Sequence, residues 1–392
     1  MGKTQGEELY DLVVVGAGPA GAVAARSAAE RGLRVLLLER SRLPRIKPCA
    51  GAVSAKALPY LGRGMERYFR EELRRAVFRV RGREAACDWG GAFAQMVFRE
   101  EFDAGLAEAA RAAGAELREG ERVRSVELGQ GEVAVRTDAA TYRGRYLAGA
   151  DGANGVTARQ LGLAQGVCRA VAVEAEVARP PDFPFHTALV DYGCIPFGYG
   201  WAFPKGERLT VGVGTFQSGK LPLRRHFGDF ARRVLPGTDW RTVQMRAHPI
   251  PLSSAVSRLH RGRALVLGDA GGLVDAFFGE GIYYAVRSGI MAAAAVEGAL
   301  GRGGDLSEYQ TAVEEAFGAD LGYAAKVARY FYRLPVLAHL LMVERGDAGR
   351  LFLDVVAGSR SYGEFWRENR RHLFRLGFIR GRRRRREAEG SG

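Results

Sequence analysis

Three glycines near the amino terminus have the spacing Gly16-x-Gly18-x-x-Gly21, and the acidic residue Glu39 follows them. In this pattern the first glycine permits a tight turn, the second lets the backbone approach a pyrophosphate, and the third lets a helix pack close to a strand. The start of that helix favours negative charge, and a carboxylate at Glu39 can accept hydrogen bonds from a ribose diol. The motif therefore predicts a dinucleotide site, without distinguishing NAD from FAD.

Two later segments combine glycine with aspartate. Residues 149–154 read GADGAN, residues 264–272 read ALVLGDAGG, and GEGI follows at 279–282. Together with the glycine motif, they resemble the FAD fingerprints of the p-hydroxybenzoate-hydroxylase-like flavoproteins. The resemblance implies that Asp269 hydrogen-bonds the ribityl chain. It also implies that a helix start near Gly281 faces the flavin, where its positive dipole end stabilises the charge of the reduced ring.

Four stretches resemble the geranylgeranyl reductase family of isoprenoid-reducing flavoenzymes, and the resemblance covers residues 10 to 300. The third stretch is the most specific, because it combines two aromatic residues with a closing Phe-Pro-Lys. The stretches are PRIKPCAGAVS at 44–54, FREEFDAGL at 98–106, PFGYGWAFPK at 196–205 with VGVG at 211–214, and GDAGGLVDAFFGEGI at 268–282.

This resemblance implies FAD as the cofactor and no metal. Arg99 would contact the pyrophosphate or the ribityl chain, and the alternative for it is an ordinary surface arginine at a helix start. The predicted FAD-binding residues are Gly16, Gly18, Pro19, Ala20, Gly21, Glu39, Arg40, Ala50, Gly51, Val53, Arg99, Val123, Asp151, Gly268, Asp269, Gly279, Gly281 and Ile282.

Cys49, Tyr199 and Trp201 are the predicted catalytic residues. By the resemblance, Cys49 lies beside the isoalloxazine ring. Tyr199 and Trp201 stand two positions apart, so both would face one side of a strand. The alternatives are an inert buried thiol and ordinary aromatic core. An isolated alkene needs a hydride and a proton inside a dry, tightly held site, and Cys49 and Tyr199 are the candidate acids.

The leading hypothesis for function is reduction of carbon–carbon double bonds in a polyprenyl lipid, a prenyl diphosphate or the side chain of menaquinone. Because one complete nucleotide fingerprint is present, either NAD(P)H docks transiently or a protein donor reduces the flavin. The alternative is an FAD monooxygenase or halogenase of the same superfamily. A non-catalytic prenyl-binding protein is a third class. We expect no nucleic-acid partner, because the sequence contains no recognised nucleic-acid module.

The elements that must position these residues follow from hydrophobic patterning. Strand, helix and strand at 10–16, 20–31 and 33–39 form a βαβ unit, and a second buried strand at 264–268 precedes a helix at 285–300. Alternating segments at 167–177 and 201–214 are typical of antiparallel strands. The prediction is a mixed α/β fold. It contains a discontinuous Rossmann-type FAD-binding domain (8–60, 97–165 and 260–300), an inserted antiparallel β-sheet substrate domain (61–96 and 166–259), a helical C-terminal region (301–381) and a basic disordered tail (382–392).

Composition bears on location and partners. The chain has 392 residues and a formal net charge of +14. That charge reflects either an arginine-rich codon bias or a partner that carries phosphates. The scattered cysteines and the lack of a signal peptide or a long apolar run predict a cytoplasmic protein without a transmembrane helix. The aromatic stretch 330–343 and a C-terminal region that ends in Arg382–Arg386 predict peripheral contact with the inner face of the cell membrane; the alternative is a solvated tail.

Overall fold

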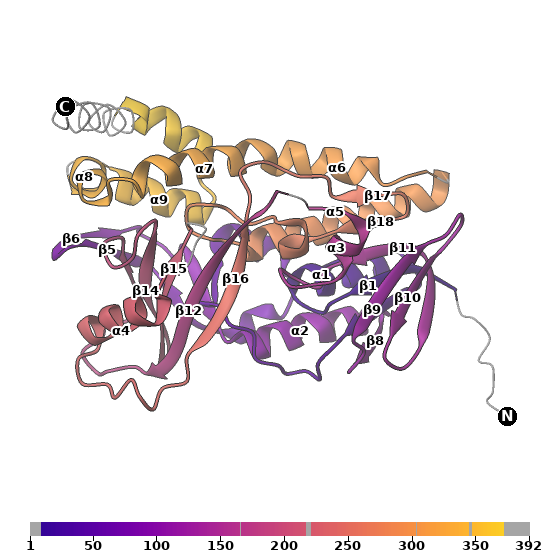
Figure 1. Ribbon diagram of the computed structural model, residues 1–392, viewed down its shortest axis with the longest axis horizontal. Helices are drawn as coiled ribbons and strands as arrows, with labels where there is room; N and C mark the ends of the chain where they lie inside the picture. The colour runs from indigo at the N-terminus through magenta and orange to yellow at the C-terminus, as the bar shows by residue number, and fades with distance from the viewer. Residues whose placement is uncertain (1–8, 165, 217–220, 303, 345–346, 372–392) are drawn as a thin grey trace, which may run out of the picture.

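The computed structural model describes residues 9–371, except 165, 217–220, 303 and 345–346. A mostly parallel sheet lies at one end of the molecule and a mostly antiparallel sheet at the other, and long helices connect the two ends (Figure 1). The predicted mixed α/β class is therefore confirmed.

The parallel sheet has the strand order β17-β18-β11-β1-β2-β8, and the antiparallel pair β9 and β10 extends from β11. Strands β1 and β2 are buried along most of their length, as expected when both faces of a parallel sheet are covered. Two of its strands come from late in the chain. The bounds are β1 Leu9–Val15, β2 Val35–Glu39, β8 Glu116–Glu119, β9 Val123–Leu128, β10 Val133–Thr137, β11 Thr141–Gly149, β17 His260–Arg261 and β18 Ala264–Val266.

Small residues bring two helices of this region into close contact. Helix α1 covers Pro19–Ala29, and α5 covers Ile282–Arg302. A Cβ built on Gly289 of α5 would lie 2.6 Å from the carbonyl oxygen of Ala20 in α1. Small side chains therefore allow α1 and α5 to pack closely. This close packing keeps the start of α5 next to the nucleotide-binding turn.

The second sheet has seven strands in the order β16-β12-β15-β14-β13-β5-β6. It was predicted to be antiparallel, but its neighbours β13 and β5 pair parallel, because they come from distant parts of the chain. The predicted segment 201–214 is not one strand, because Gly206 (φ +64°) turns the chain between β14 and β15. Strand β16 was not predicted. It contains Pro249 and Pro251, and it lies at the sheet edge, where proline is tolerated. The bounds are β5 Arg75–Val80, β6 Arg83–Asp88, β12 Cys168–Ala178, β13 Thr187–Asp191, β14 Gly198–Lys205, β15 Arg208–Thr215 and β16 Arg246–Leu252.

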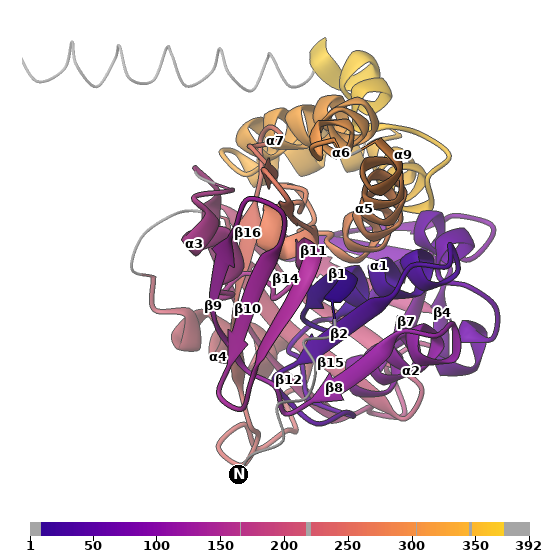
Figure 2. The same ribbon diagram turned by 90° about the vertical axis from the view of Figure 1, so that its right-hand side faces the viewer.

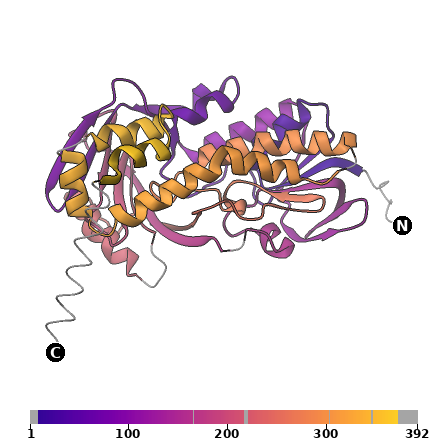
Figure 3. The ribbon, with the colours of Figure 1, turned by 90° about the horizontal axis from the view of Figure 1, so that it is seen from above.

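Helices complete both ends, and a small three-stranded sheet (β3-β7-β4) contacts β14 of the second sheet and helix α5. Helices α5, α6, α7 and α9 form a layer above the strands in Figure 2, and the orange helices run lengthwise over the molecule in Figure 3. The remaining bounds are β3 Ala52–Ser54, β4 Phe69–Leu73, β7 Ala94–Val97, α2 Arg99–Ala112, α3 Thr157–Leu161, α4 Leu223–Val234, α6 Ser307–Val313, α7 Ala319–Phe331, α8 Pro335–Ala338 and α9 Ala348–Ala357.

The described helices do not include one that is long and apolar enough to cross a membrane. Within the aromatic stretch 330–343, Phe331, Tyr332 and Met342 are buried in the core formed by the second sheet and the C-terminal helices. These three side chains are therefore not available as membrane anchors. The predicted basic tail, Arg382–Arg386, lies outside the described residues.

Candidate functional site

One continuous cavity of about 670 Å³ lies between the two large sheets. At one end its walls are the glycine-rich turn after β1 and the residues around Glu39. At the other end its walls are apolar side chains of the second sheet and of α9. These apolar lining residues include Ala76, Phe78, Val190, Leu353 and Val356, and Leu73, at the end of β4 in the small sheet, lines the same part of the cavity.

The three motif glycines have different surroundings. Gly16 has φ +100°, and a Cβ there would lie 2.5 Å from the carbonyl oxygen of Ala150. A Cβ on Gly21 would overlap the carbonyl oxygen of Gly16. Beside Gly18, in contrast, the nearest atom is a guanidinium nitrogen of Arg45 at 3.8 Å. Gly18 therefore leaves open a cradle that a side chain would fill, which fits a bound pyrophosphate.

Arg45 is a cavity residue to which sequence analysis gave no role. Its Nε lies 3.3 Å from Oε1 of the buried Glu39, and its Nη1 donates to Oδ2 of Asp103 at 3.0 Å. Glu39 also accepts a hydrogen bond from the backbone N–H of Ala17 at 2.9 Å. The guanidinium therefore stands over the glycine-rich turn, held by two carboxylates, where it suits a phosphate group. The feature of the sequence that could have indicated this role is the position of Arg45 directly after Pro44 in the 44–54 motif.

Arg99 is buried, with an exposed fraction of 6%. Its Nε and Nη2 donate to the two carboxylate oxygens of Asp103 at 2.8 and 2.9 Å. Burial disfavours the charged form, but Asp103 and Cys49 hold the pKa of Arg99 above its ordinary value. The surface-arginine alternative is therefore wrong, and Arg99 is a permanent cation in the cavity wall.

The later glycine–aspartate segments also meet at this cavity. Asp269 lines it, and Gly281 lies so close to Asp269 that a Cβ would be 3.2 Å from its carboxylate. Helix α5 begins directly afterwards, at Ile282. The carboxylate of Asp151 accepts the backbone N–H groups of Val156 and Thr157 at 2.6 and 3.0 Å. That side chain therefore stabilises the start of α3 while the residue lies in the cavity wall.

Three of the predicted FAD-binding residues do not line the cavity. Gly21 packs against Gly16, Val53 is fully buried in a neighbouring core, and Gly268 lies between Ala20 and Ala285. These residues pack behind the residues that line the cavity and stabilise their positions. The lining residues among those predicted are Gly16, Gly18, Pro19, Ala20, Glu39, Arg40, Ala50, Gly51, Arg99, Val123, Asp151, Asp269, Gly279, Gly281 and Ile282.

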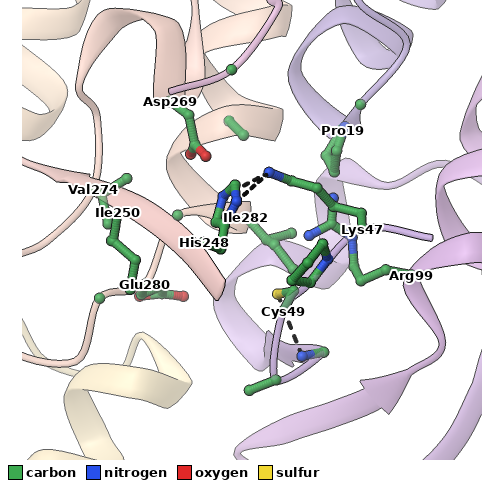
Figure 4. A pocket seen from close by; sticks show the side chains of 18 of the residues that line it. Pro19, Lys47, Cys49, Arg99, His248, Ile250, Asp269, Val274, Glu280 and Ile282 are labelled. Carbon is green, nitrogen blue, oxygen red and sulfur yellow. Dashed lines mark hydrogen bonds between the residues drawn. The ribbon is translucent and has the colours of Figure 1, made fainter. Parts of the chain in front are cut away.

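Lys47, on the 44–54 loop, and His248, on β16, both line the cavity and point toward each other (Figure 4). Nζ of Lys47 lies 2.7 Å from Nε2 of His248. Burial lowers the pKa of both groups, and with the nearby positive charge of Lys47 it brings the pKa of His248 to about 3. The imidazole is therefore neutral and accepts a hydrogen bond from the lysine. Sequence analysis missed this pair because His248 belongs to a proline-containing strand.

Cys49 lies in the cavity wall beside Arg99 (Figure 4). Its Sγ accepts the backbone N–H of Gly51 at 3.4 Å, and its own backbone N–H donates to the carboxylate of Glu174. Glu174, on β12, also lines the cavity and was not predicted. The signal in the sequence was a pair of carboxylates, Glu174 and Glu176, inside the otherwise apolar segment AVAVEAEVA at 170–178.

Tyr199 and Trp201 both line the cavity, as their spacing predicted, and both belong to the aromatic core around it. The Tyr199 hydroxyl donates to the carbonyl oxygen of Phe278, and burial raises its pKa. A Cβ on Gly212 would overlap the indole of Trp201, which explains the first glycine of the VGVG segment. Nε1 of Trp201 is buried and has no hydrogen-bond partner among the described residues.

Comparison with known proteins gives a consistent result. Residues 10–192 match the family model of an FAD binding domain. Digeranylgeranylglycerophospholipid reductase 2 of Methanopyrus kandleri is 31% identical over 346 residues, which cover 82% of this chain and 86% of that protein. Menaquinone reductase of Mycobacterium tuberculosis is 31% identical over 316 residues, which cover 73% of this chain and 76% of that protein.

A solved structure has the same fold. The geranylgeranyl bacteriochlorophyll reductase-like protein of Thermoplasma acidophilum superimposes with a TM-score of 0.76 at 22% sequence identity. The match covers 94% of this chain and 100% of that chain.

Proposed function

This chain belongs to the geranylgeranyl reductase family of FAD-dependent oxidoreductases, and we propose that it reduces carbon–carbon double bonds in a polyprenyl chain. When bound, reduced FAD supplies the hydride. The observation that carries the proposal is the single cavity, which joins a cradle for a pyrophosphate to an apolar compartment. A dinucleotide and a hydrocarbon chain can therefore occupy one enclosed space.

The residues of this chain would hold and desolvate the alkene. Apolar side chains such as Phe78 and Val190 line the compartment, which favours a prenyl chain and excludes water from the reacting bond. Tyr199 and Trp201 would form the wall against which that bond is oriented. Because the Tyr199 hydroxyl already donates to a carbonyl and has a raised pKa, it suits a positioning role better than proton donation.

The substrate would be a geranylgeranyl lipid, a prenyl diphosphate or a menaquinone side chain, and the electron donor NAD(P)H or a reducing protein. We also propose peripheral contact with a membrane, because such a substrate is delivered from a bilayer. The net charge of +14 supports this contact. So does Ile46, which is 62% exposed on a loop at the cavity and lies between Arg45 and Lys47.

The test is anaerobic reduction of the FAD-loaded protein with dithionite, followed by incubation with a panel of prenyl compounds and mass spectrometry. We expect a gain of two mass units for each bond reduced, and no gain with the oxidised protein as control. If no compound in the panel gains hydrogen, the proposal is wrong. If compounds gain oxygen when air is admitted, the monooxygenase alternative is correct.

A further inference from the structure

Glu174 is a buried carboxyl group in the wall of the catalytic cavity. It lies on β12, between Ala172, which lines the same cavity, and Glu176. Its exposed fraction is 8%, and one oxygen accepts the backbone N–H of Cys49. This hydrogen bond ties the second sheet to the 44–54 loop of the nucleotide-binding region. Glu174 therefore lies where the two halves of the site meet.

The cations around Glu174 are engaged with other groups. Nζ of Lys205, on β14, lies 2.9 Å from Glu176, and Arg99 of α2 binds Asp103. Arg246, opposite Glu174 on β16, donates to Gln244 at 2.7 Å. Farther along β16, His248 is neutral and accepts from Lys47.

Among the residues that the structure describes, no lysine, arginine or histidine forms an ion pair with Glu174. A buried carboxyl group without an ion pair favours its protonated form. Burial accordingly raises the pKa of Glu174 to about 7, although Lys205 and the hydrogen bond from Cys49 oppose the shift. Glu176, two residues along the same face, has a lowered pKa because Lys205 and Arg208 outweigh its burial. The two neighbouring carboxyl groups therefore differ in their protonation near neutral pH.

We propose that Glu174 is the general acid of the reaction and donates the proton to the alkene. The inference rests on the proposed function. The π bond of the alkene breaks, one carbon gains the hydride from the reduced flavin, and the other carbon gains the proton from the O–H bond of Glu174. The flavin is oxidised and Glu174 becomes a carboxylate. After the product leaves, the solvent returns a proton to this carboxylate before the next turnover.

Glu174→Gln is the central variant, because its amide oxygen can still accept the N–H of Cys49 while the transferable proton is lost. We expect normal FAD content and kcat lower by about 10²-fold or more, with KM changed far less. In the wild type, kcat should fall as pH rises through about 7, since the acid must be protonated. That decline should be absent from the residual rate of the variant.

The matched control is Glu176→Gln, which removes a carboxyl group from the same face of the same strand but outside the cavity lining. It should keep most of the wild-type rate, and the fall of kcat should move to lower pH, because loss of the Glu176 charge and release of Lys205 both lower the pKa of Glu174. Glu174→Asp restores a carboxyl group and should recover part of the rate. Wild-type kcat and pH profile in Glu174→Gln would overturn the proposal, and so would equal losses in the two glutamine variants.

Difference infrared spectra of the FAD-loaded protein on either side of pH 7 separate this proposal from the proposed function. A carboxylic-acid carbonyl band should titrate in the wild type and disappear in Glu174→Gln, or shift in Glu174→Asp if the glutamine variant does not fold. Absence of such a band contradicts the assignment of Glu174, whatever the substrate. If the band is present but the wild type reduces no prenyl compound, the proposed function fails and the role in proton donation fails with it.

Discussion

At the scale of single residues, the site depends on where the chain leaves space for a ligand. It also depends on which buried ionisable groups form ion pairs and which do not. Gly18 leaves open the cradle beside Arg45, and Trp201 lies in space that a side chain at Gly212 would fill. Glu174 has no ion pair among the described residues, whereas the nearby Arg99 has a bidentate one. These contrasts distinguish groups that are available to a ligand from groups whose contacts stabilise the cavity wall.

Gly18→Val should abolish FAD binding, because the side chain would occupy the place of the pyrophosphate. The variant should still fold, since no atom lies within 3.8 Å of a Cβ at this position. The measurement is the flavin absorbance of the purified protein, together with its thermal unfolding. Gly131→Val is the control, because a Cβ on Gly131 meets no atom within 4 Å, its φ is not positive, and the residue lies outside the cavity lining. Normal flavin content in Gly18→Val would contradict the assignment of the cradle.

Asp269→Ala should weaken FAD binding more than it lowers stability. The carboxylate lines the cavity, and loss of a hydrogen bond to a charged group costs about 1.5–3 kcal/mol. That cost corresponds to a Kd for FAD raised by about 10- to 100-fold. Titration of the apoprotein with FAD measures it. An unchanged Kd would mean that Asp269 does not contact the ribityl chain.

Tyr199→Phe should impair prenyl turnover while FAD content stays near normal. The substitution leaves the carbonyl of Phe278 without its donor and loosens the wall beside the reacting bond, at a cost of about 1 kcal/mol. Turnover and flavin content, measured on the same preparation, test this prediction. A loss of flavin or of folding in place of turnover would favour a purely structural role for this aromatic residue.

At the scale of elements, α5 has two functions, because it begins at the cavity and then packs along α1. The contact of Gly289 with Ala20 keeps the two helices close together, so the start of α5 stays near Asp269. Strand β12 similarly presents Glu174 to the cavity on one face, while Val173 and Ala175 pack under α4 on the other. The site therefore depends on helix–helix and sheet–helix distances set outside it.

Gly289→Ala tests this dependence. The added Cβ would lie 2.6 Å from the carbonyl oxygen of Ala20, so α5 must move, at a cost of about 1–3 kcal/mol. We expect a lower Tm and weaker FAD binding. Gly301→Ala, in the last turns of the same helix, meets no atom within 4 Å and should be neutral or stabilising. Equal Tm values for the two variants would show that the close packing of α1 and α5 is unimportant.

At the scale of the whole molecule, the active cavity belongs to the junction between two sheets and not to either one. The chain supplies the nucleotide-binding sheet from its beginning and again from residues 260–266, so the second sheet is inserted between them. The C-terminal helices then close the apolar end of the cavity through Leu353 and Val356 of α9. A prenyl chain would enter a space that all three parts of the molecule enclose.

The full chain should bind anionic vesicles, and binding should weaken with salt and with truncation after Gly381. Each arginine near an anionic surface contributes about 1 kcal/mol, so a block of five can hold the protein there reversibly. Co-sedimentation of both forms measures the effect, with neutral vesicles as the control. Equal binding of both forms, or none by either, would mean that residues 382–392 have no role at the membrane.

The sequence by itself determined the features that depend on local spacing. The glycine motif, the following helix and Glu39 lie close together in the chain, and turn geometry and hydrophobic period specify them directly. The βαβ unit, the strand at Ala264 and the facing pair Tyr199 and Trp201 were predictable for that reason. Family resemblance added FAD and the class of reaction.

Only the tertiary structure decided which distant groups meet. Glu174 contacts Cys49 across 125 positions, and Lys47 reaches His248 across 201 positions. No local pattern encodes these pairs, because they depend on how the 44–54 loop docks against the second sheet. The same holds for protonation. Glu174 and Glu176 are the same residue type on one face of one strand, yet the pKa of Glu174 is raised and that of Glu176 is lowered. Burial and the position of Lys205 make the difference, and both exist only after the chain has folded.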